Sequence, residues 1–307
     1  MFTFLIAAAA VAVGMPVTAP GPQGPLEGTY LDAGKHTPVV LIIPGSGPTD
    51  RDGNNPLGIT AAPYRLLAKA LATQAVSSVR IDKRGIGGSK GAVADGNKVT
   101  IADYVTDTHN WIAAIRKRTG VKCVWVLGHS EGSLVALAAA QQPDGMCGVI
   151  SVSGAGRKLS DVIRDQLRAN PANAPLLDQA MAALDALEKG QHVDVSGMNP
   201  ALLRLFAPQV QDFLIDDFRH DPAKLAASLK LPLLIVQGER DIQVSAADAR
   251  ALAAAQPKAK LVLVPAMNHV LKDVANDDRS ANVATYSDSS LPVDSTLIDA
   301  VASFVKR

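Results

Sequence analysis

The sequence has almost no excess of charge of either sign and very few cysteines. Its 307 residues contain 30 Lys and Arg against 29 Asp and Glu, a formal net charge of +1. This balance gives no electrostatic basis for a nucleic-acid partner. The two cysteines, Cys123 and Cys147, have no His or second Cys at metal-ligand spacing, so we expect no zinc site. They are predicted either to form a disulfide or to remain buried free thiols.

Long apolar runs are also lacking. The segment Phe2–Val13 is apolar but too short to span a bilayer. It resembles the apolar core of a secretory signal peptide, with small residues near Val17 and Ala19, although no Lys or Arg precedes Lys35. We therefore expect residues 1–20 to be a signal peptide, and the mature chain to be exported without stable membrane insertion. The alternative is a frayed or membrane-associated apolar tail on a cytoplasmic protein.

The remainder of the chain has the composition of a globular protein with a sizeable core, since 48% of the residues are hydrophobic and 19% are charged. Continuous apolar runs with β-branched residues alternate with helical segments, which predicts a mostly parallel, doubly wound α/β sheet. The strands are expected at 37–43, 76–82, 125–129, 147–153, 231–237 and 260–264, after a short strand at 26–33. Residues 16–28 are rich in Pro and Gly and are interpreted as a linker.

The pattern changes after Gly156. From residue 157 to 230 no strand is evident, and apolar residues recur at helical spacing between prolines. We predict a helical lid at 157–230, inserted between two parts of an α/β core at 21–156 and 231–307. Within the second part, Leu271 to Leu291 is expected to be a long polar loop.

The stretch Gly128-His129-Ser130-Glu131-Gly132 follows a buried strand and precedes an Ala- and Leu-rich helix. In that setting the spacing G-x-S-x-G is typical of a sharp turn that exposes a serine in a strained conformation. The two glycines remove side chains that would collide where the strand passes into the helix. Ser130 is therefore predicted to be a nucleophile, with an ordinary Gly/Ser loop as the alternative.

A serine hydroxyl needs a base to accept its proton and an acid to orient that base. For a strand–turn–helix nucleophile the chain order is Ser, acid, His, and both partners lie in loops at the carboxyl ends of later strands. His269 follows the last predicted strand and Asp241 follows the strand before it. We therefore predict that Ser130, His269 and Asp241 form a catalytic triad, with Glu239 as the competing acid.

An oxyanion formed at this serine needs two preorganised N–H donors. We expect one from the backbone of Glu131, which directly follows the nucleophile. The other is expected from Ser46, or from a flanking glycine, in the turn-rich loop 44–55. The Asp50-Arg51-Asp52 segment is expected to pin this loop.

Other suggestive motifs predict no metal or cofactor. The acids of loop 44–55 alternate as in a calcium loop, but a glycine comes too early and Ala61 stands where the bidentate Glu would be. The Gly-rich segment 85–89 lacks the spacing of a phosphate loop and is interpreted as a packed turn. The pair Asp216-Asp217 in the lid is expected on a solvated helix face.

Taken in order, these motifs resemble the α/β-hydrolase family, and most closely its esterase and serine aminopeptidase-like branch. The resemblance rests on Pro44–Gly53, Asp82–Gly85, Gly128–Gly132, Asp241 and Asn268-His269, and it covers about residues 26–307. It implies the fold and the triad but no particular substrate, because this fold hosts many hydrolytic reactions. One departure is Pro44, where many relatives carry His before the oxyanion glycine.

The resulting hypothesis is a cofactor-free serine hydrolase that cleaves small-molecule carboxylic esters with short acyl groups through an acyl-enzyme. A serine aminopeptidase or amidase is the alternative, and it would need an acidic pocket for a free amine, from Asp216, Asp217 or Glu131. An alternative of another class is a non-catalytic binding protein on a hydrolase scaffold. The sequence does not indicate an oligomeric state.

Overall fold

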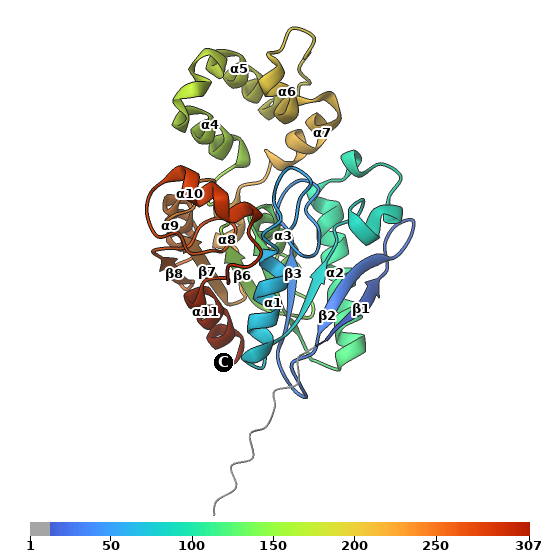
Figure 1. Ribbon diagram of the computed structural model, residues 1–307. Coiled ribbons are helices and arrows are strands. Elements are labelled where there is room, and N and C mark those ends of the chain that lie inside the picture. The colour runs from blue at the N-terminus through green and yellow to red at the C-terminus, as the bar shows by residue number, and fades with distance from the viewer. Residues whose placement is uncertain (1–12) are drawn as a thin grey trace, which may run out of the picture.

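The computed structural model describes residues 13–307. Its centre is an eight-stranded sheet with the order β1-β2-β4-β3-β5-β6-β7-β8 (Figure 1). The strands β3 to β8 pair in parallel, and only β1 and β2 are antiparallel to their neighbours, so the mostly parallel sheet predicted from the apolar runs is confirmed. The strands are β1 Gly14–Ala19, β2 Leu26–Leu31, β3 Val39–Ile43, β4 Ser77–Ile81, β5 Val124–His129, β6 Met146–Val152, β7 Leu233–Gly238 and β8 Lys260–Val264.

Helices cover both faces of this sheet, which explains why its strands are apolar throughout. On β3, Val39, Leu41 and Ile43 point into one buried core, whereas Val40 and Ile42 point into the other. Successive side chains of a strand alternate between faces, so a strand covered on both sides reads as a continuous apolar run. The first core is closed by α2 (Ile101–Thr119), α3 (Glu131–Ala139), α8 (Pro222–Ala227) and α9 (Ala246–Ala255), and the second by α1 (Pro63–Thr73) and α11 (Ser295–Val305).

The first strand of the sheet lies where the sequence indicated a linker and the end of a signal peptide. β1 pairs with β2 along its whole length, from Gly14 opposite Leu31 to Ala19 opposite Leu26. In the second half of β1 the side chains alternate, and those of Val17 and Ala19 are buried. The linker interpretation of 16–28 is therefore wrong, because the alternation of buried residues outweighs the Pro and Gly content. The predicted signal peptide 1–20 overlaps this strand, and its residues 1–12 lie outside the described residues.

The inserted helices rise beyond the carboxyl ends of the strands (Figure 1). They are α4 (Leu159–Ala169), α5 (Leu177–Glu188), α6 (Pro200–Phe206) and α7 (Pro208–Asp217), and they bury an apolar core of their own around Leu184, Phe206 and Phe218. The last helix of the predicted insertion behaves differently. α8 packs on α3 and α9, with Ala226 and Leu229 in the core of the main domain. The last part of the predicted insertion, from Pro222 to Lys230, thus packs on the main domain and not with α4 to α7.

The predicted polar loop after Leu271 also contains a helix, α10 (Arg279–Ala284). Asp278 caps it by accepting hydrogen bonds from the N–H groups of Ser280 and Ala281. Six residues are too few to show a helical period in the sequence, so the cap was its only signal.

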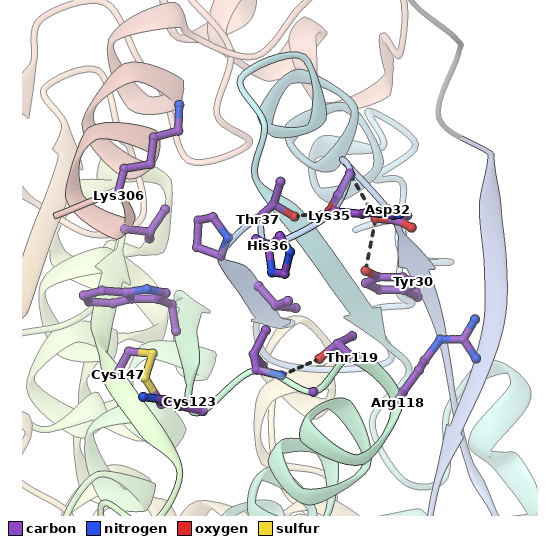
Figure 2. A pocket seen from close by; sticks show the side chains of 18 of the residues that line it. Tyr30, Asp32, Lys35, His36, Thr37, Arg118, Thr119, Cys123, Cys147 and Lys306 are labelled. Atoms are coloured by element: carbon purple, nitrogen blue, oxygen red, sulfur yellow. Dashed lines mark hydrogen bonds between the residues drawn. A yellow bond between two sulfur atoms is a disulfide. The ribbon is translucent and has the colours of Figure 1, made fainter.

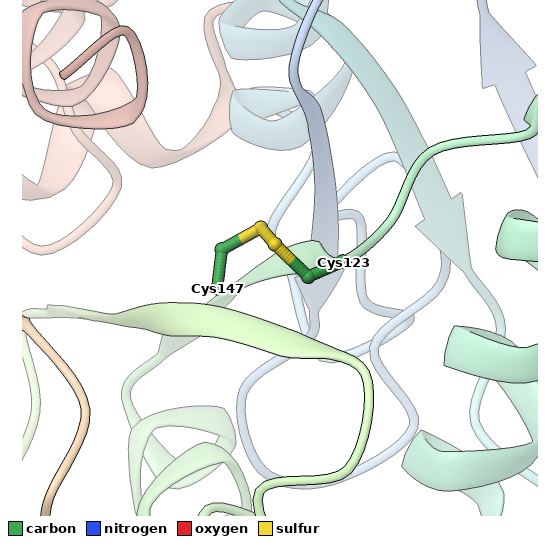
Figure 3. The surroundings of a disulfide bond; sticks show 2 residues. All are labelled: Cys123 and Cys147. Carbon is green, nitrogen blue, oxygen red and sulfur yellow. A yellow bond between two sulfur atoms is a disulfide. The ribbon is translucent and has the colours of Figure 1, made fainter.

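The two cysteines form a disulfide between the starts of neighbouring strands (Figure 3). Cys123 immediately precedes β5 and Cys147 is the second residue of β6, and their Cα atoms are 5.1 Å apart. This decides between the two alternatives that the sequence left open. Within residues 13–307, no helix combines the length and the hydropathy needed to cross a membrane.

Candidate active site

The turn between β5 and α3 has the geometry that its sequence predicts. Ser130 lies at φ 54° and ψ −122°, a conformation that costs a non-glycine residue energy and is found mostly at functional sites. A Cβ atom on Gly128 would come within 1.9 Å of the carbonyl oxygen of Gly132, and one on Gly132 within 2.4 Å of that of Ile43. Only glycine fits at both positions, and together they allow the tight passage from strand to helix.

The predicted base and acid meet at the ends of β8 and β7. His269 Nδ1 lies 2.8 Å from Asp241 Oδ2, and both side chains are almost fully buried. The other oxygen of Asp241 accepts hydrogen bonds from the N–H groups of Gln243 and Val244, at 2.8 and 2.9 Å. Burial acts to raise the pKa of Asp241, but His269 and these N–H donors outweigh it and hold the pKa below its ordinary value. The carboxylate is therefore ionised and fixed.

The competing acid lies elsewhere. Glu239 is half exposed, and its carboxylate faces Arg250 at 4.0 Å. Among the described residues it forms no hydrogen bond or ion pair with His269, whose Nδ1 is bonded to Asp241.

Ser130 follows the end of β5, at the same edge of the sheet, and is not hydrogen-bonded to this pair. Its neighbour His129 places Nε2 2.8 Å from the backbone oxygen of His269, and the two imidazole rings are 4.8 Å apart. No hydrogen bond joins the Ser130 hydroxyl to His269 in the described structure. The structure thus brings the three predicted residues to one edge of the sheet and leaves Ser130 half-buried.

A buried chain of hydrogen bonds, which the sequence did not reveal, connects this edge to loop 44–55. The Gly45 N–H donates to the Tyr64 hydroxyl at 3.0 Å, and that hydroxyl lies 2.8 Å from His129 Nδ1. Burial, reinforced by His269, lowers the pKa of His129 to about 3, so its ring is neutral. Because the backbone oxygen of His269 can only accept, His129 carries its proton on Nε2, and Tyr64 donates to Nδ1. The donor and the acceptor of each hydrogen bond from Gly45 to His269 are thereby assigned.

The predicted oxyanion donors differ in availability. The N–H of Glu131 is the first of α3 and has no partner within the helix. The Gly45 N–H is already used by Tyr64, whereas the Ser46 N–H forms no hydrogen bond within residues 13–307. Of the donors considered in loop 44–55, Ser46 is therefore free and Gly45 is not.

Loop 44–55 is pinned as the sequence suggested. Arg51 donates three hydrogen bonds to Asp82, from its backbone and from its guanidinium group, at 2.6–2.8 Å. Asp52 pairs with Arg80, and Asp50 accepts from the N–H groups of Asp52 and Asn54. The acids that resemble a calcium loop are occupied by these bonds. Residues 13–307 contain no group of three or more His, Cys, Asp or Glu side chains that could hold a metal ion.

A buried cluster of charge lies next to Ser130 and reaches into the lid. Lys83 Nζ donates to Glu131 Oε1 at 2.9 Å and to the Gly45 oxygen at 2.8 Å. Burial would lower the pKa of Lys83, but Glu131 raises it above its ordinary value, so the ammonium is charged. Nothing in the local sequence distinguishes Lys83 from the exposed lysines of other loops.

Asp216 and Asp217 do not lie on a solvated helix face, so that expectation is wrong. Asp216 accepts a hydrogen bond from the Ile101 N–H at 2.8 Å. Asp217 is buried, and one of its oxygens has no hydrogen-bond partner. Burial, with the negative charge of Glu131, raises the pKa of Asp217 well above its ordinary value. Both carboxylates are turned inward because α7 packs on the main domain through this end.

Buried hydrogen bonds of Asn268 hold the loop that carries His269. Asn268 is fully buried and donates to Thr285 Oγ1 at 2.7 Å and to Asn282 Oδ1 at 3.1 Å. Its own amide oxygen accepts from the N–H of Lys272. The short helix α10 thus serves to fix the backbone of His269.

A cavity of about 400 Å³ opens next to this machinery. Its walls are loop 44–55 at Gly47, the Lys83–Glu131 pair, Tyr104 of α2, and Val210 and Phe213 of the lid helix α7. A larger cleft of about 860 Å³ lies at the amino ends of the strands, far from these residues. The smaller cavity is lined by Glu131, the residue that directly follows Ser130.

Known proteins share both motifs and architecture with this chain. The model of the family described as serine aminopeptidase, S33, matches residues 57–206. Esterase EstD from Thermotoga maritima is 25% identical over 277 residues, which are 88% of this chain and 62% of that protein. The chain therefore spans less than two thirds of the length of this relative.

Two solved structures share the fold. The Pyrococcus furiosus esterase PF2001 superposes with a TM-score of 0.59 at 17% identity, over 96% of this chain and 91% of the other. An alpha/beta fold family hydrolase from Bacillus anthracis superposes with a TM-score of 0.56 at 16% identity, over 95% and 98%.

Proposed function

We propose that the chain, which has the α/β-hydrolase fold, is a serine hydrolase that cleaves small carboxylic esters, with Ser130 as its nucleophile. The observation that carries this proposal is the Asp241–His269 bond at 2.8 Å, at the same edge of the sheet as a serine held at φ 54°. Nucleophilic acyl transfer requires a serine nucleophile and an imidazole oriented by a third group.

In the proposed reaction, His269 removes the proton of the Ser130 hydroxyl through Nε2, because Nδ1 faces Asp241. The Ser130 oxygen attacks the ester carbonyl carbon, and the resulting oxyanion accepts hydrogen bonds from the N–H groups of Ser46 and Glu131. His269 then returns the proton to the leaving alcohol as the C–O bond breaks. Water, deprotonated by His269, releases the acid from the acyl-enzyme. Asp241 stabilises the imidazolium in both halves of the cycle.

The adjoining cavity supports a small substrate. Its volume of about 400 Å³ is near the lower end of the usual range for ligand pockets, about 300–1,000 Å³. Val210, Phe213 and Tyr104 give it apolar walls, which suit a short acyl or alcohol group.

A peptidase that recognises a free amine is less well supported. Such an enzyme needs an uncompensated carboxylate near the nucleophile. Glu131 is neutralised by Lys83, Asp216 is bonded to the Ile101 N–H, and the raised pKa of Asp217 favours its uncharged form. Turnover of simple esters against amino-acyl-p-nitroanilides measures this preference, and we expect the esters to be favoured.

The serine assignment is tested by Ser130→Ala, with Ser133→Ala as the matched control. Ser133 lies on the same helix, and its hydroxyl is bonded to that of Ser151 at 2.6 Å. We expect Ser130→Ala to abolish p-nitrophenyl acetate hydrolysis and labelling by a fluorophosphonate probe, and Ser133→Ala to retain both. A wild-type chain that turns over no ester and takes no label would instead indicate a binding protein on this scaffold.

We also propose that the protein works in an oxidising compartment outside the cytoplasm. The disulfide between Cys123 and Cys147 supports this, because such bonds are rare in the reducing cytosol. Fractionation of cells, followed by thiol labelling of the recovered protein, tests both the location and the bond.

A further inference from the structure

One tyrosine in the wall of the smaller cavity has an unused hydroxyl group. The hydroxyls of Tyr30, Tyr64 and Tyr286 each have a side-chain hydrogen-bond partner, at 3.3, 2.8 and 3.1 Å. The remaining tyrosine, Tyr104, is hydrogen-bonded only through its backbone among residues 13–307. Because the hydroxyl of a buried tyrosine usually has a partner, the missing one at Tyr104 is expected from a bound molecule.

The ring of Tyr104 is held firmly, and its hydroxyl stays accessible. The residue lies on α2 and is 9% exposed. The ammonium group of Lys83 lies 4.9 Å from the centre of the ring, and the ring of Phe213 packs against it edge to face at 6.3 Å. The unpaired hydroxyls of Ser78 and Ser153 are sealed from solvent, whereas that of Tyr104 is not. Burial raises the pKa of Tyr104, so the hydroxyl keeps its proton and can donate a hydrogen bond.

The cavity that Tyr104 lines adjoins Ser130 through the loop beside this serine and the residue after it. Loop 44–55 lies against Ser130, because a Cβ atom on Gly45 would come within 3.2 Å of Ser130 Cβ. Gly47 of the same loop and Glu131, which directly follows Ser130, line the cavity together with Tyr104. The groups proposed to hold the ester carbonyl thus lie next to this cavity.

The cavity has no unpaired charge to offer a ligand. Its three charged residues are Lys83, Arg84 and Glu131. Lys83 is bonded to Glu131 at 2.9 Å, and Arg84 makes two hydrogen bonds to Asp107, each at 2.7 Å. The second carboxylate oxygen of Glu131 is sealed from solvent. A charged substituent would therefore lose its hydration without gaining a counter-ion, so the cavity favours an uncharged one.

We propose that Tyr104 determines specificity by donating a hydrogen bond to a second, uncharged oxygen of the substrate. The proposal rests on ester hydrolysis at Ser130, and it narrows the substrate class to esters with an ether, carbonyl or hydroxyl oxygen in the group that enters the cavity. An alkyl group in the same place would cover the hydroxyl and leave a desolvated donor without a partner. Sites built in this way discriminate against analogues that lack the matching polar atom.

Pairs of esters that differ by an ether oxygen in place of one methylene test this proposal. Two pairs vary the acyl group: p-nitrophenyl methoxyacetate against butyrate, and p-nitrophenyl 3-methoxypropionate against pentanoate. A third pair, 2-methoxyethyl acetate against butyl acetate, varies the alcohol. The measured quantity is the ratio of kcat/KM for the ether ester to kcat/KM for the alkyl ester, in the wild-type protein and in Tyr104→Phe. The intrinsic reactivity of the esters cancels when the two proteins are compared.

Tyr104→Phe deletes the hydroxyl and keeps the ring with its contacts to Lys83 and Phe213. We expect the ratio to fall about 3- to 10-fold in at least one pair, which is the effect of one uncharged hydrogen bond. The pair that responds identifies the part of the substrate that enters the cavity.

Tyr30→Phe is the matched control. Its hydroxyl is bonded to Asp32 in the larger cleft at the amino ends of the strands, as Figure 2 shows. This variant should keep the wild-type ratio in all three pairs.

Two results would overturn the proposal while leaving the proposed hydrolysis intact. The first is a ratio that Tyr104→Phe leaves unchanged in every pair, and the second is an equal loss of turnover for ether and alkyl esters, as expected of a purely structural tyrosine. A wild-type protein that hydrolyses none of the six esters and takes no fluorophosphonate label would instead refute the proposed function, and the role of Tyr104 with it.

Discussion

The hydroxyl of Tyr64 is the most informative group to remove from this site, by the substitution Tyr64→Phe. It accepts the Gly45 N–H at 3.0 Å and donates to His129 Nδ1 at 2.8 Å, and His129 in turn holds the backbone oxygen of His269. Tyr64→Phe keeps the ring, which packs at 5.4 Å from that of His129, and deletes only the oxygen. The Gly45 N–H and His129 Nδ1, both buried, then lose a hydrogen-bond partner at the same time.

The expected cost follows from those two groups. Each buried donor or acceptor left without a partner costs about 1–3 kcal/mol, so the variant should lose about 2–6 kcal/mol of stability. The activity should fall as well, because the chain of bonds aligns the loop of Ser46 and the backbone of His269. We expect kcat/KM to fall about 10- to 100-fold, since small misplacements of reacting groups have effects of this size. The loss should lie in kcat, as Tyr64 is buried and does not line the cavity.

The assay compares thermal unfolding, kcat and KM for p-nitrophenyl acetate, and the rate of fluorophosphonate labelling. Tyr30→Phe is the control, because its hydroxyl donates to Asp32 at 3.3 Å at the opposite end of the molecule. If Tyr64→Phe labels and turns over at the wild-type rate, the chain of bonds does not position the site. If it loses only stability, as a purely structural tyrosine would, the positioning role is refuted as well.

Three further predictions concern the acid, the lid and the disulfide. Asp241→Asn should lower kcat by about 10³–10⁴, because an amide no longer selects the imidazole tautomer with its proton on Nδ1; steady-state kinetics would show a much smaller loss if Glu239 were the acid. The pKa of Asp217 is raised in the folded state, so between the unfolded and the folded pKa the folded chain keeps a proton that the unfolded chain releases. The free energy of unfolding therefore decreases as the pH rises through this range. Asp217→Asn should therefore raise Tm by about 1–3 °C near pH 8 and leave it unchanged near pH 3, and calorimetry at both pH values shows whether the sign is right. Cys123→Ser/Cys147→Ser opens a link between residues 24 apart and should cost about 3 kcal/mol in urea unfolding, unless the bond is absent from the isolated protein.

The features that the sequence predicted well are those whose causes are local. β3 is apolar at every position because its side chains enter both cores, as is typical of a strand that is covered on both faces. The glycines at 128 and 132 are required by contacts within a few residues of Ser130, so their spacing alone identifies the turn. Asp241 and His269 could be proposed from topology, since each lies in the loop that follows a strand at the same edge of the sheet.

The features that escaped prediction depend on contacts between distant segments. Tyr64 is one apolar position of an amphipathic helix until α1 is docked beneath His129. Asp217 is a charged residue near a helix end, and only the packing of α7 on the main domain buries it. The Pro and Gly content of residues 16–28 indicates a linker in the sequence, and only the pairing with β2, which satisfies the backbone of β1, shows a strand there.

One buried ammonium group relates the two proposed oxyanion donors. Lys83 Nζ holds the carbonyl oxygen of Gly45 at 2.8 Å, and this oxygen belongs to the same peptide unit as the Ser46 N–H. Because that unit is planar and trans, a fixed oxygen on one side fixes the direction of the N–H on the other. The same Nζ holds the side chain of Glu131 at 2.9 Å, and the N–H of Glu131 is the second donor. Lys83 thus orients the Ser46 donor, and the first turn of α3 orients the Glu131 donor, before any substrate arrives, which is the condition under which such groups stabilise a transition state most strongly. The burial of the charged Lys83 has a physical reason in this arrangement, because an exposed, mobile ammonium could not fix the Gly45–Ser46 peptide unit.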